Sequence, residues 1–153
     1  PEDVAAKCVA VAAEVKTLEK EKAELNAKIA ASQTGDVMAN AVAVGKVRAA
    51  TVQLTDVSAD ALRKMGDEIK DKNPDAVVVF ASVNGSSASL LCVCGKEAVA
   101  AGANAGRIIK ETAAVTGGKG GGRPDSAMAG AGDASLIGKA LEAVPSIVAN
   151  FVK

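Results

Sequence analysis

The stretch AVVVFASVNGSSASLLCVC (residues 76–94) contains two apolar runs separated by a turn signal. The first run, Ala76–Val83, is apolar almost throughout, which is typical of a central strand buried on both faces. Asn84-Gly85 favours a two-residue hairpin turn, because such turns need the positive φ that glycine adopts readily. The second run, residues 88–94, is therefore expected to return antiparallel to the first. This hairpin predicts the centre of a sheet that carries helices on at least one face.

Sequence on either side of the hairpin predicts further helices and one more strand. Val42–Leu54 carries β-branched residues at loosely alternating positions, which indicates one strand that bends near Gly45 or residues 49–50. Ser58 is a suitable N-cap for the helix ADALRKMGDEIKDK, which Asn73-Pro74 ends. The patterns after residue 94 predict a helix over residues 102–115, a glycine loop over residues 116–132, and a helix LIGKALEAV that Asp133 or Ser135 caps and Pro145 kinks or restarts. The predicted fold class is mixed α/β, with a small mixed or antiparallel sheet flanked by helices.

The first 33 residues predict a long helix of the coiled-coil type that precedes a globular domain over residues 36–153. Apolar residues recur there at spacings of four and three, which is the pattern of a heptad seam. Lys22 interrupts the seam and is a candidate for setting register or partner number, and Gly35-Asp36 is expected to end the helix. The alternative is a single helix packed on its own globular domain. The candidate dimerisation residues are Val4, Cys8, Val11, Val15, Leu18, Leu25 and Ile29.

Composition excludes several classes of site. The chain has no His, which removes imidazole bases and most zinc sites. It has no Trp or Tyr, and Phe80 and Phe151 lie in apolar runs, so aromatic platforms for stacking RNA bases are not expected. The three cysteines, Cys8, Cys92 and Cys94, predict buried reduced thiols. We therefore expect no catalytic residue, no metal site and no cofactor in this chain.

The charge and hydropathy of the chain indicate its class of partner and its location less strongly than its composition indicates its sites. The formal net charge is zero, with 18 basic and 18 acidic residues, whereas a general nucleic-acid binder is usually basic. No apolar run is long enough to cross a membrane and no targeting segment is visible, so a cytoplasmic protein without membrane partners is expected. Because the chain begins at Pro1 without Met, we expect it to be part of a longer protein.

The segment TGGKGGGRPDSAMAGAG (residues 116–132) is costly to order, because seven of its seventeen residues are glycine. It fails the P-loop pattern, since Gly120 follows Lys119, and it fails the dinucleotide pattern, since Arg123 stands where the third glycine is needed. Three explanations remain: a flexible linker, an anion-binding loop, and a structural crossing of two backbones. A linker would not need Arg-Pro-Asp, so this motif favours an ordered loop.

Anion binding has a definite physical basis in this segment. Successive glycines let several backbone N–H groups point into one concavity, and the Arg123 guanidinium matches two phosphate oxygens at once. Pro124 fixes the backbone, and Asp125 can orient the guanidinium through an ion pair. Arg107 and Lys110 on the preceding helix are further candidates, for which a solvated helix face is the alternative. The candidate phosphate-binding residues are Lys119, Gly120, Gly121, Gly122, Arg123, Pro124, Asp125, Arg107 and Lys110.

The extended motif TGGKGGGRPDSAMAGAGD resembles the signature of the DHH-associated domain at the C-terminus of alanyl-tRNA synthetases. The upstream stretches VVVFASVNGSSASLLCVCGKE and AGANAGRIIKETAAVTGGKGGGRPD are similar to the rest of that domain, so the resemblance covers residues 42–152. The heptad helix is similar to the helical subdomain that precedes the domain in the family. One departure lies within the motif, where Met128 stands in place of the family's usual Gln.

The resemblance implies an accessory function without chemistry. In the family this region binds the outer corner of tRNA(Ala), helps aminoacylation and editing to act on one tRNA, and supports dimerisation through its helical part. The parent chain would be an alanine–tRNA ligase that uses ATP, magnesium and zinc outside this region, and the rest of that chain would be a partner. Without stacking platforms, contacts to RNA would be made to phosphate, 2′-hydroxyl and shape, and they would depend on salt.

Two other functions compete with this one. The chain could be an oligomerisation or protein-interaction module that has not kept tRNA binding, which the neutral net charge favours. It could instead be an enzyme domain acting on nucleotides, but the sequence offers no base, nucleophile or metal cluster for such chemistry.

Overall fold

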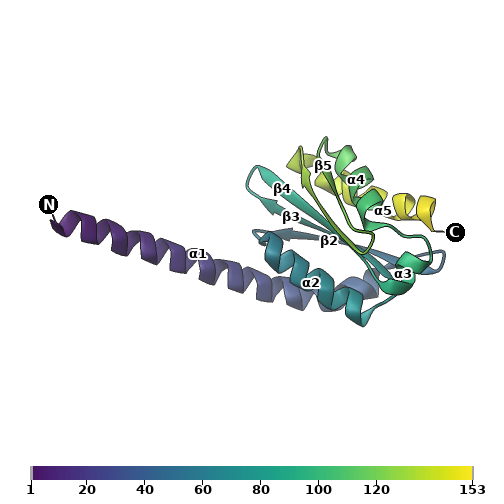
Figure 1. Cartoon of the computed structure of the whole chain (residues 1–153), viewed down its shortest axis with the longest axis horizontal. Helices are drawn as coiled ribbons and strands as arrows, with labels where there is room; N and C mark the ends of the chain where they lie inside the picture. Colours follow the sequence, from purple (N-terminus) through teal and green to yellow (C-terminus); the bar gives the residue numbers. More distant parts are fainter. Residues whose placement is uncertain (1, 153) are drawn as a thin grey trace.

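The computed structural model describes residues 2–152, and within the first helix it leaves out the side chains of residues 2–6, 8, 23, 26, 27, 29–31 and 33–36. Figure 1 shows the long helix α1 (Glu2–Val37) projecting from a body in which one sheet lies between layers of helix. The described sheet has six strands in the order β1-β2-β3-β4-β6-β5. The predicted α/β class, with a mixed sheet flanked by helices, is confirmed.

The predicted hairpin forms the centre of the sheet. Strands β3 (Ala76–Asn84) and β4 (Ser87–Cys94) pair antiparallel, and Gly85 opens the turn between them with a φ of +62°. Strand β2 (Val47–Thr55) lies parallel to β3 on its other side. The single bent strand expected over residues 42–54 is wrong, because β1 (Val42–Val44) is a separate edge strand that pairs antiparallel with β2. The chain reverses between them at Gly45, whose φ is +60°.

Helices cover both faces of β3, as its apolar run predicts. Helix α2 (Ala59–Lys72) packs over β3 and β4 on one face, where Val78 and Phe80 are fully buried. Helices α4 (Ala105–Val115) and α5 (Ile137–Phe151) cover the other face, where Val77 and Val79 are fully buried. The alternation of side chains along β3 therefore contributes to two separate core clusters. The predicted N-cap of α2 is confirmed, since the Ala61 N–H donates to Ser58 Oγ over 3.2 Å.

Several predicted helix boundaries are wrong for local reasons. Helix α4 begins at Ala105 and not at residue 102, because the Asn104 side chain caps it by accepting a hydrogen bond from the Arg107 N–H at 3.1 Å. The short helix α3 (Lys96–Ala100) was not expected. After the 3-10 turn η2 (Ala134–Leu136), α5 continues through Pro145 without a break. Helix α1 runs past residues 35–36 to Val37 and is followed by the 3-10 turn η1 (Met38–Asn40).

The glycine segment is a β-hairpin and not the loop that was expected. Strands β5 (Lys119–Gly122) and β6 (Ser126–Ala131) pair antiparallel, and β6 also pairs with β4. The preceding glycines end α4: Gly117 has a φ of +70°, and the Gly118 N–H donates to the Ala113 carbonyl at 2.8 Å. This pattern is a Schellman motif.

Close backbone approach explains part of the glycine content. A Cβ on Gly122 would lie 2.7 Å from Ala127 Cα, and a Cβ on Gly106 of α4 would lie 2.8 Å from the Gly122 carbonyl oxygen. Real Cβ atoms essentially never approach other atoms so closely. A Cβ on Gly121 would meet nothing within 4 Å. The structural explanation for the segment therefore applies to the side that faces α4 and not to Gly121.

We predict that Gly106→Ala destabilises the protein although it replaces a helical glycine. The new methyl group would press on the backbone of Gly122, and such overpacking typically costs ~1–3 kcal/mol. The matched control is Gly138→Ala in α5, where a Cβ meets nothing within 4 Å and where alanine should stabilise the helix by up to ~1 kcal/mol. Urea unfolding of both variants measures the difference, and equal stabilisation by both would contradict the close packing of α4 on β5.

An ion pair joins the starts of the two parallel strands. Arg48 on β2 donates from Nε to Asp75 Oδ2 at 2.7 Å and from Nη2 to Asp75 Oδ1 at 2.8 Å. The Arg48 N–H also donates to the Asp75 carbonyl at 3.0 Å. The hydrogen bonds from Arg48 lower the pKa of the Asp75 carboxyl, against the opposing effect of burial. The ionised carboxylate is therefore the form that stabilises the folded state.

We predict that Asp75→Asn lowers stability at neutral pH and has little effect in strong acid. Because folding lowers the pKa of Asp75, its contribution is present above the unfolded-state value and is lost as the pH falls through the folded-state value. The free energy of unfolding, measured by urea at pH ~7 and pH ~2, should show a difference between wild type and variant only at the higher pH. Asp71→Asn on exposed α2 surface is the control. A pH-independent loss would indicate that the carboxylate charge is not what stabilises this contact.

Candidate nucleic-acid interface

The Arg-Pro-Asp motif forms the tip of the β5–β6 hairpin, and main-chain bonds fix it to the body. The Arg123 N–H donates to the Ser126 carbonyl at 3.0 Å, which closes the two-residue turn. The Pro124 carbonyl accepts from the Ala105 N–H at 2.8 Å, and the Asp125 carbonyl accepts from the Cys94 N–H at 2.9 Å. The tip therefore lies between the start of α4 and the end of β4. The expectation of an ordered segment in place of a linker is confirmed.

The alternation of the hairpin divides its residues between the two faces of the sheet. Gly121 lies opposite Met128, which packs against the core cluster beneath α2. Lys119 and Arg123 are two residues away from Gly121 on either side, so they belong to the same face. Gly122 lies opposite Ala127, which belongs to the cluster beneath α4. One face thus carries two cations with a bare glycine between them, and the other carries closely packed small residues.

A groove of about 590 Å³ lies between α2 and this face of the hairpin. Its floor is built from β5 and β6, and residues of α2 form one wall. Most floor residues are small, so the backbone of the hairpin is accessible from the groove. The lining residues are Gly121, Gly122, Ser126, Ala127 and Met128 on the floor, Arg63, Asp67 and Lys70 on α2, and Arg123 and Asp125 at the hairpin tip.

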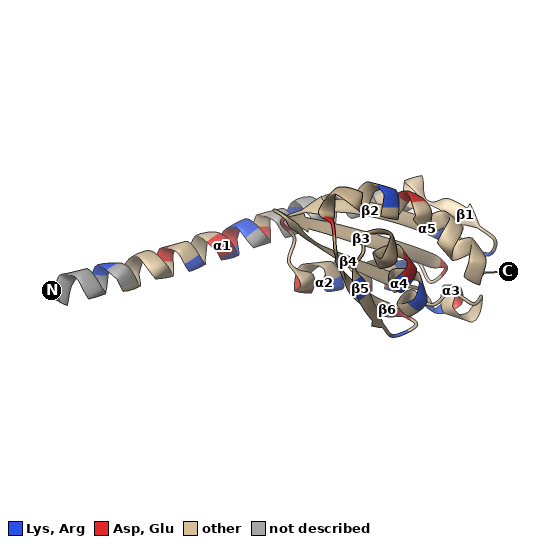
Figure 2. Cartoon of the chain, turned by 90° about the horizontal axis from the view of Figure 1, so that it is seen from above, with Lys and Arg blue, Asp and Glu red and all other residues tan. Residues whose placement is uncertain are grey.

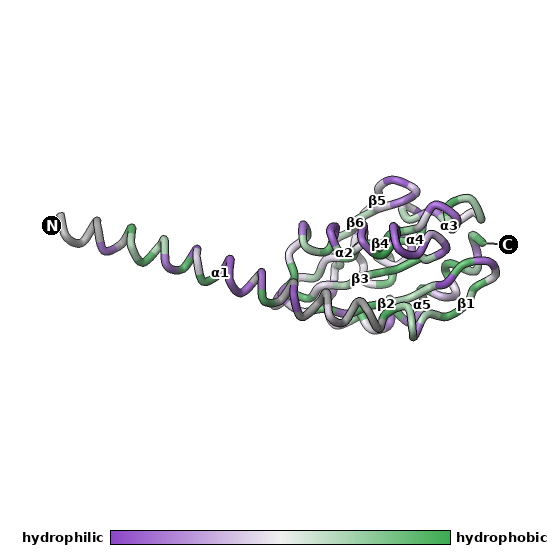
Figure 3. Tube along the Cα trace, turned by 90° about the horizontal axis from the view of Figure 1, so that it is seen from below, coloured by the Kyte–Doolittle hydropathy of each residue, from purple (hydrophilic) through white to green (hydrophobic). Residues whose placement is uncertain are grey.

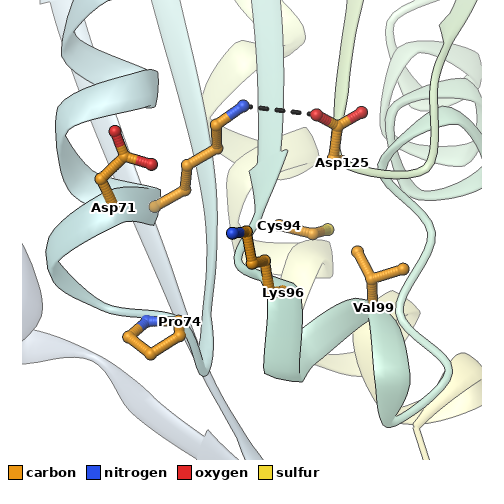
Figure 4. Close-up of a pocket in the computed structure, with 7 residues that line it drawn as sticks. Asp71, Pro74, Cys94, Lys96, Val99 and Asp125 are labelled. Atoms are coloured by element: carbon orange, nitrogen blue, oxygen red, sulfur yellow. Dashed lines mark hydrogen bonds and ion pairs between the residues drawn. The ribbon is translucent and has the colours of Figure 1, made fainter.

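The acidic residue of the tip is held by α2. Asp125 Oδ2 lies 3.3 Å from Lys70 Nζ, which also contacts Asp67 Oδ1 at 2.9 Å. Figure 4 shows this bond as a dashed line that reaches across the gap from α2 to Asp125. The hydrogen bonds, first with Asp67 and then with Asp125, raise the pKa of Lys70 against the effect of burial. The expectation that Asp125 orients Arg123 is wrong, since no ion pair joins these two residues in the described part of the chain.

Arg63 is a groove residue that the sequence analysis missed. Its Nε lies 3.1 Å from the sulfur of Met128, and its Nη1 lies 3.5 Å from Asp60. The Met128 sulfur therefore accepts a weak hydrogen bond from Arg63 of α2. Arg63 and Lys70 are seven residues apart, which places them on one face of the helix, and this spacing was a usable signal. The sequence did not show which strands that face would approach.

The remaining candidate cations do not line this groove. Arg107 and Lys110 lie on the exposed surface of α4, in the layer on the other side of the sheet. Figure 2 shows basic and acidic residues together along α4. Arg107, Lys110, Lys119 and Arg123 are all exposed, and none has an ion-pair partner among the residues that the structure describes. The structure thus brings Arg123 together with the glycine floor and leaves Arg107 and Lys110 apart from it.

The described apolar seam residues of α1 are largely exposed. Among those with described side chains, Val11, Val15, Leu18 and Leu25 keep between 47% and 62% of their surface exposed. Figure 3 shows hydrophobic positions recurring along this projecting part of α1. Lys22, which interrupts the seam, pairs with Asp56 of the body at 3.3 Å. The side chains of three other seam residues lie outside the described ones: Val4, Cys8 and Ile29.

Other features of the described residues bear on the class of protein. No helix within residues 2–152 is both long enough and apolar enough to cross a membrane. No three His, Cys, Asp or Glu side chains in the described part of the chain are placed to hold a metal ion. Cys92 and Cys94 are free and buried, as predicted, and burial raises the pKa of the Cys92 thiol. The Cys8 side chain lies outside the described residues.

Comparison with known proteins identifies the family. Residues 40–150 match the model of the DHHA1 domain. The chain is 38% identical over 148 residues to the alanine–tRNA ligase of Acetivibrio thermocellus, which covers 97% of this chain and 17% of that protein. It is 35% identical over 153 residues to the alanine–tRNA ligase of Bacillus thuringiensis, covering 100% and 17%. The chain therefore spans about a sixth of the length of these relatives.

A solved structure agrees with this family. The crystal structure of the C-Ala domain from Aquifex aeolicus alanyl-tRNA synthetase superposes with a TM-score of 0.66 at 25% identity, covering 72% of this chain and 98% of that one. The glycine-Arg-Pro-Asp hairpin lies within the matched family range. The chain belongs to the DHHA1 domain family, and within it the chain is similar to the C-terminal, C-Ala region of alanyl-tRNA synthetases.

Proposed function

We propose that this chain is the accessory C-terminal region of an alanine–tRNA ligase, and that it binds tRNA through the groove between α2 and the β5–β6 hairpin. The observation that carries the proposal is Arg123, an exposed guanidinium without an ion-pair partner among the described residues, at the end of a glycine-floored groove. The similarity to alanine–tRNA ligases supports tRNA(Ala) as the nucleic acid and the rest of the synthetase as the partner chain.

The geometry of the groove suits a phosphate backbone. An arginine fork can hold two phosphate oxygens, and Gly121 adds no side chain that would keep the polymer away from the hairpin. Lys119 on the same face adds a second positive charge two residues beyond Gly121. The net charge of the whole chain is zero, so attraction must come from this local distribution and not from the general field of the protein.

The groove has no aromatic residue among its lining residues, so it cannot read bases by stacking. Contacts to phosphate, 2′-hydroxyl and shape suit the outer corner of a folded tRNA. In this function the chain assists aminoacylation and editing during protein synthesis in the cytoplasm and performs no chemistry itself. As part of this proposal, we assign zinc, magnesium and ATP to the remainder of the synthetase.

We predict that Arg123→Ala weakens binding of labelled tRNA(Ala) about tenfold without lowering the melting temperature, because a charge-assisted contact of this kind contributes ~1.5 kcal/mol. Filter binding at several salt concentrations measures both the affinity and the salt slope, which should fall by about one in the variant. Arg107→Ala is the matched control, since that arginine is exposed on α4 and lies outside the groove. Unchanged affinity with lowered stability would show that Arg123 is structural.

A second candidate function, self-association through α1, rests on a separate observation. The described apolar seam residues remain about half exposed, which is costly in water for a helix that stays alone. The surrounding positions carry charges of both signs (Figure 2), as the outer positions of a coiled coil do. We propose that the seam pairs with a second copy of this helix.

We predict that the double variant Val15→Ser with Leu18→Ser is monomeric at concentrations at which the wild type forms a dimer, because it removes two apolar residues from the seam. Val9→Ser is the matched control, since Val9 is 70% exposed but lies off the seam. Light scattering over a concentration series measures the mass. A wild type that stays monomeric at high concentration would exclude self-association of this chain, and dissociation by Val9→Ser would show that the seam is not the interface.

A further inference from the structure

We propose that Lys70 is a positioning residue for the tRNA groove: by holding the Asp125 carboxylate on α2, it keeps Arg123 available for phosphate. This inference rests on the proposed function. Lys70 lies in the last turn of α2, far from the glycine motif in the sequence, and it reaches the hairpin only through the fold.

The turn geometry makes Asp125 the natural competitor for Arg123. The two residues are separated only by Pro124, in a two-residue turn closed by the bond from the Arg123 N–H to the Ser126 carbonyl. A carboxylate at this distance along the chain can fold back onto the guanidinium and neutralise it. The contact of 3.3 Å with Lys70 draws that carboxylate towards α2 instead. The side chain of Lys70 is only 22% exposed, so its position is well defined by packing.

The charges that line the groove show why this contact matters. Arg63 has Asp60 within 3.5 Å, and Lys70 has both Asp67 and Asp125 within 3.3 Å. Arg123 is therefore the one groove cation without an acidic partner among the described residues. Each additional anion in the groove would repel the phosphate that the groove is proposed to hold.

Lys70 and Asp125 also lie at the border between two cavities. They line the groove of about 590 Å³ and, in addition, a second cavity of about 360 Å³ on the side of Lys96 and Val99. In Figure 4 the bond between them spans the opening between α2 and the hairpin, above Lys96 and Cys94. Lys96 lines the second cavity but not the groove, so Lys70 is the lysine that borders both. The pair therefore directs the Asp125 side chain towards α2 at the border of the groove.

The test is a set of charge-matched variants measured by filter binding with labelled tRNA(Ala). Lys70→Met keeps most of the aliphatic chain and should weaken binding ~5-fold, with a smaller salt slope, because the released Asp125 carboxylate neutralises Arg123. Adding Asp125→Asn should restore both the affinity and the slope. Adding Asp67→Asn to Lys70→Met gives the same net charge but leaves Asp125 ionised, so it should restore neither. Thermal melts of each variant show whether it is folded.

Three outcomes would overturn the inference. Equal rescue by Asp67→Asn and Asp125→Asn would mean that only the net charge of the groove matters. An unchanged affinity of Lys70→Met would mean that Asp125 does not compete for Arg123. A further loss of binding when Lys70→Met is added to Arg123→Ala would mean that Lys70 contacts tRNA itself. If Arg123→Ala alone has no effect, the proposed function fails, whereas an effect of Arg123→Ala without an effect of Lys70→Met overturns the positioning role alone.

Discussion

Strand β3 is buried on both faces, and the placement of the helices follows from this burial. Residues 76–82 have no side that faces water, so helices must cover both faces of the sheet. Helices α4 and α5 together cover one face of the sheet. On the other face, α2 packs over β3 and β4, because a helix is ~10 Å wide and therefore covers about two strands. Helix α2 reaches β6 through the contact of Arg63 with Met128 and leaves the Gly121 side of β5 open, and the groove lies between α2 and this surface.

The glycine hairpin meets two different demands on its two faces. On the side of α4 it must be thin, because Gly106 and Gly122 bring a helix and a strand closer than side chains would permit. On the side of α2 it is bare but not crowded, because nothing lies near Gly121. The structural and anion-binding explanations of this segment are thus compatible, since alternate residues serve each one. Close packing of the hairpin against α4 fixes the position of its backbone, and the same backbone is accessible from the groove on the side of α2.

Ion pairs distribute the charge of a neutral chain. Arg48 and Asp75 neutralise each other where β2 and β3 begin, and Lys70 engages two carboxylates between α2 and the hairpin. Arg123 is left exposed without such a partner among the described residues. A formal charge of zero therefore says little about whether a site attracts phosphate. What matters is which cations the fold pairs and which it leaves accessible.

Sequence patterns alone were enough to predict the central hairpin, the Ser58 cap, the buried thiols and the resemblance to the DHH-associated domain, because each is encoded in a short pattern of neighbouring residues. It did not reveal β5 as a strand, since KGGG has no apolar alternation that marks a buried face. Only the tertiary structure brought Lys70 to Asp125, 55 residues along the chain. A local pattern reports which face of an element is apolar, whereas the partner of a charged side chain depends on which element the packed sheet places beside it.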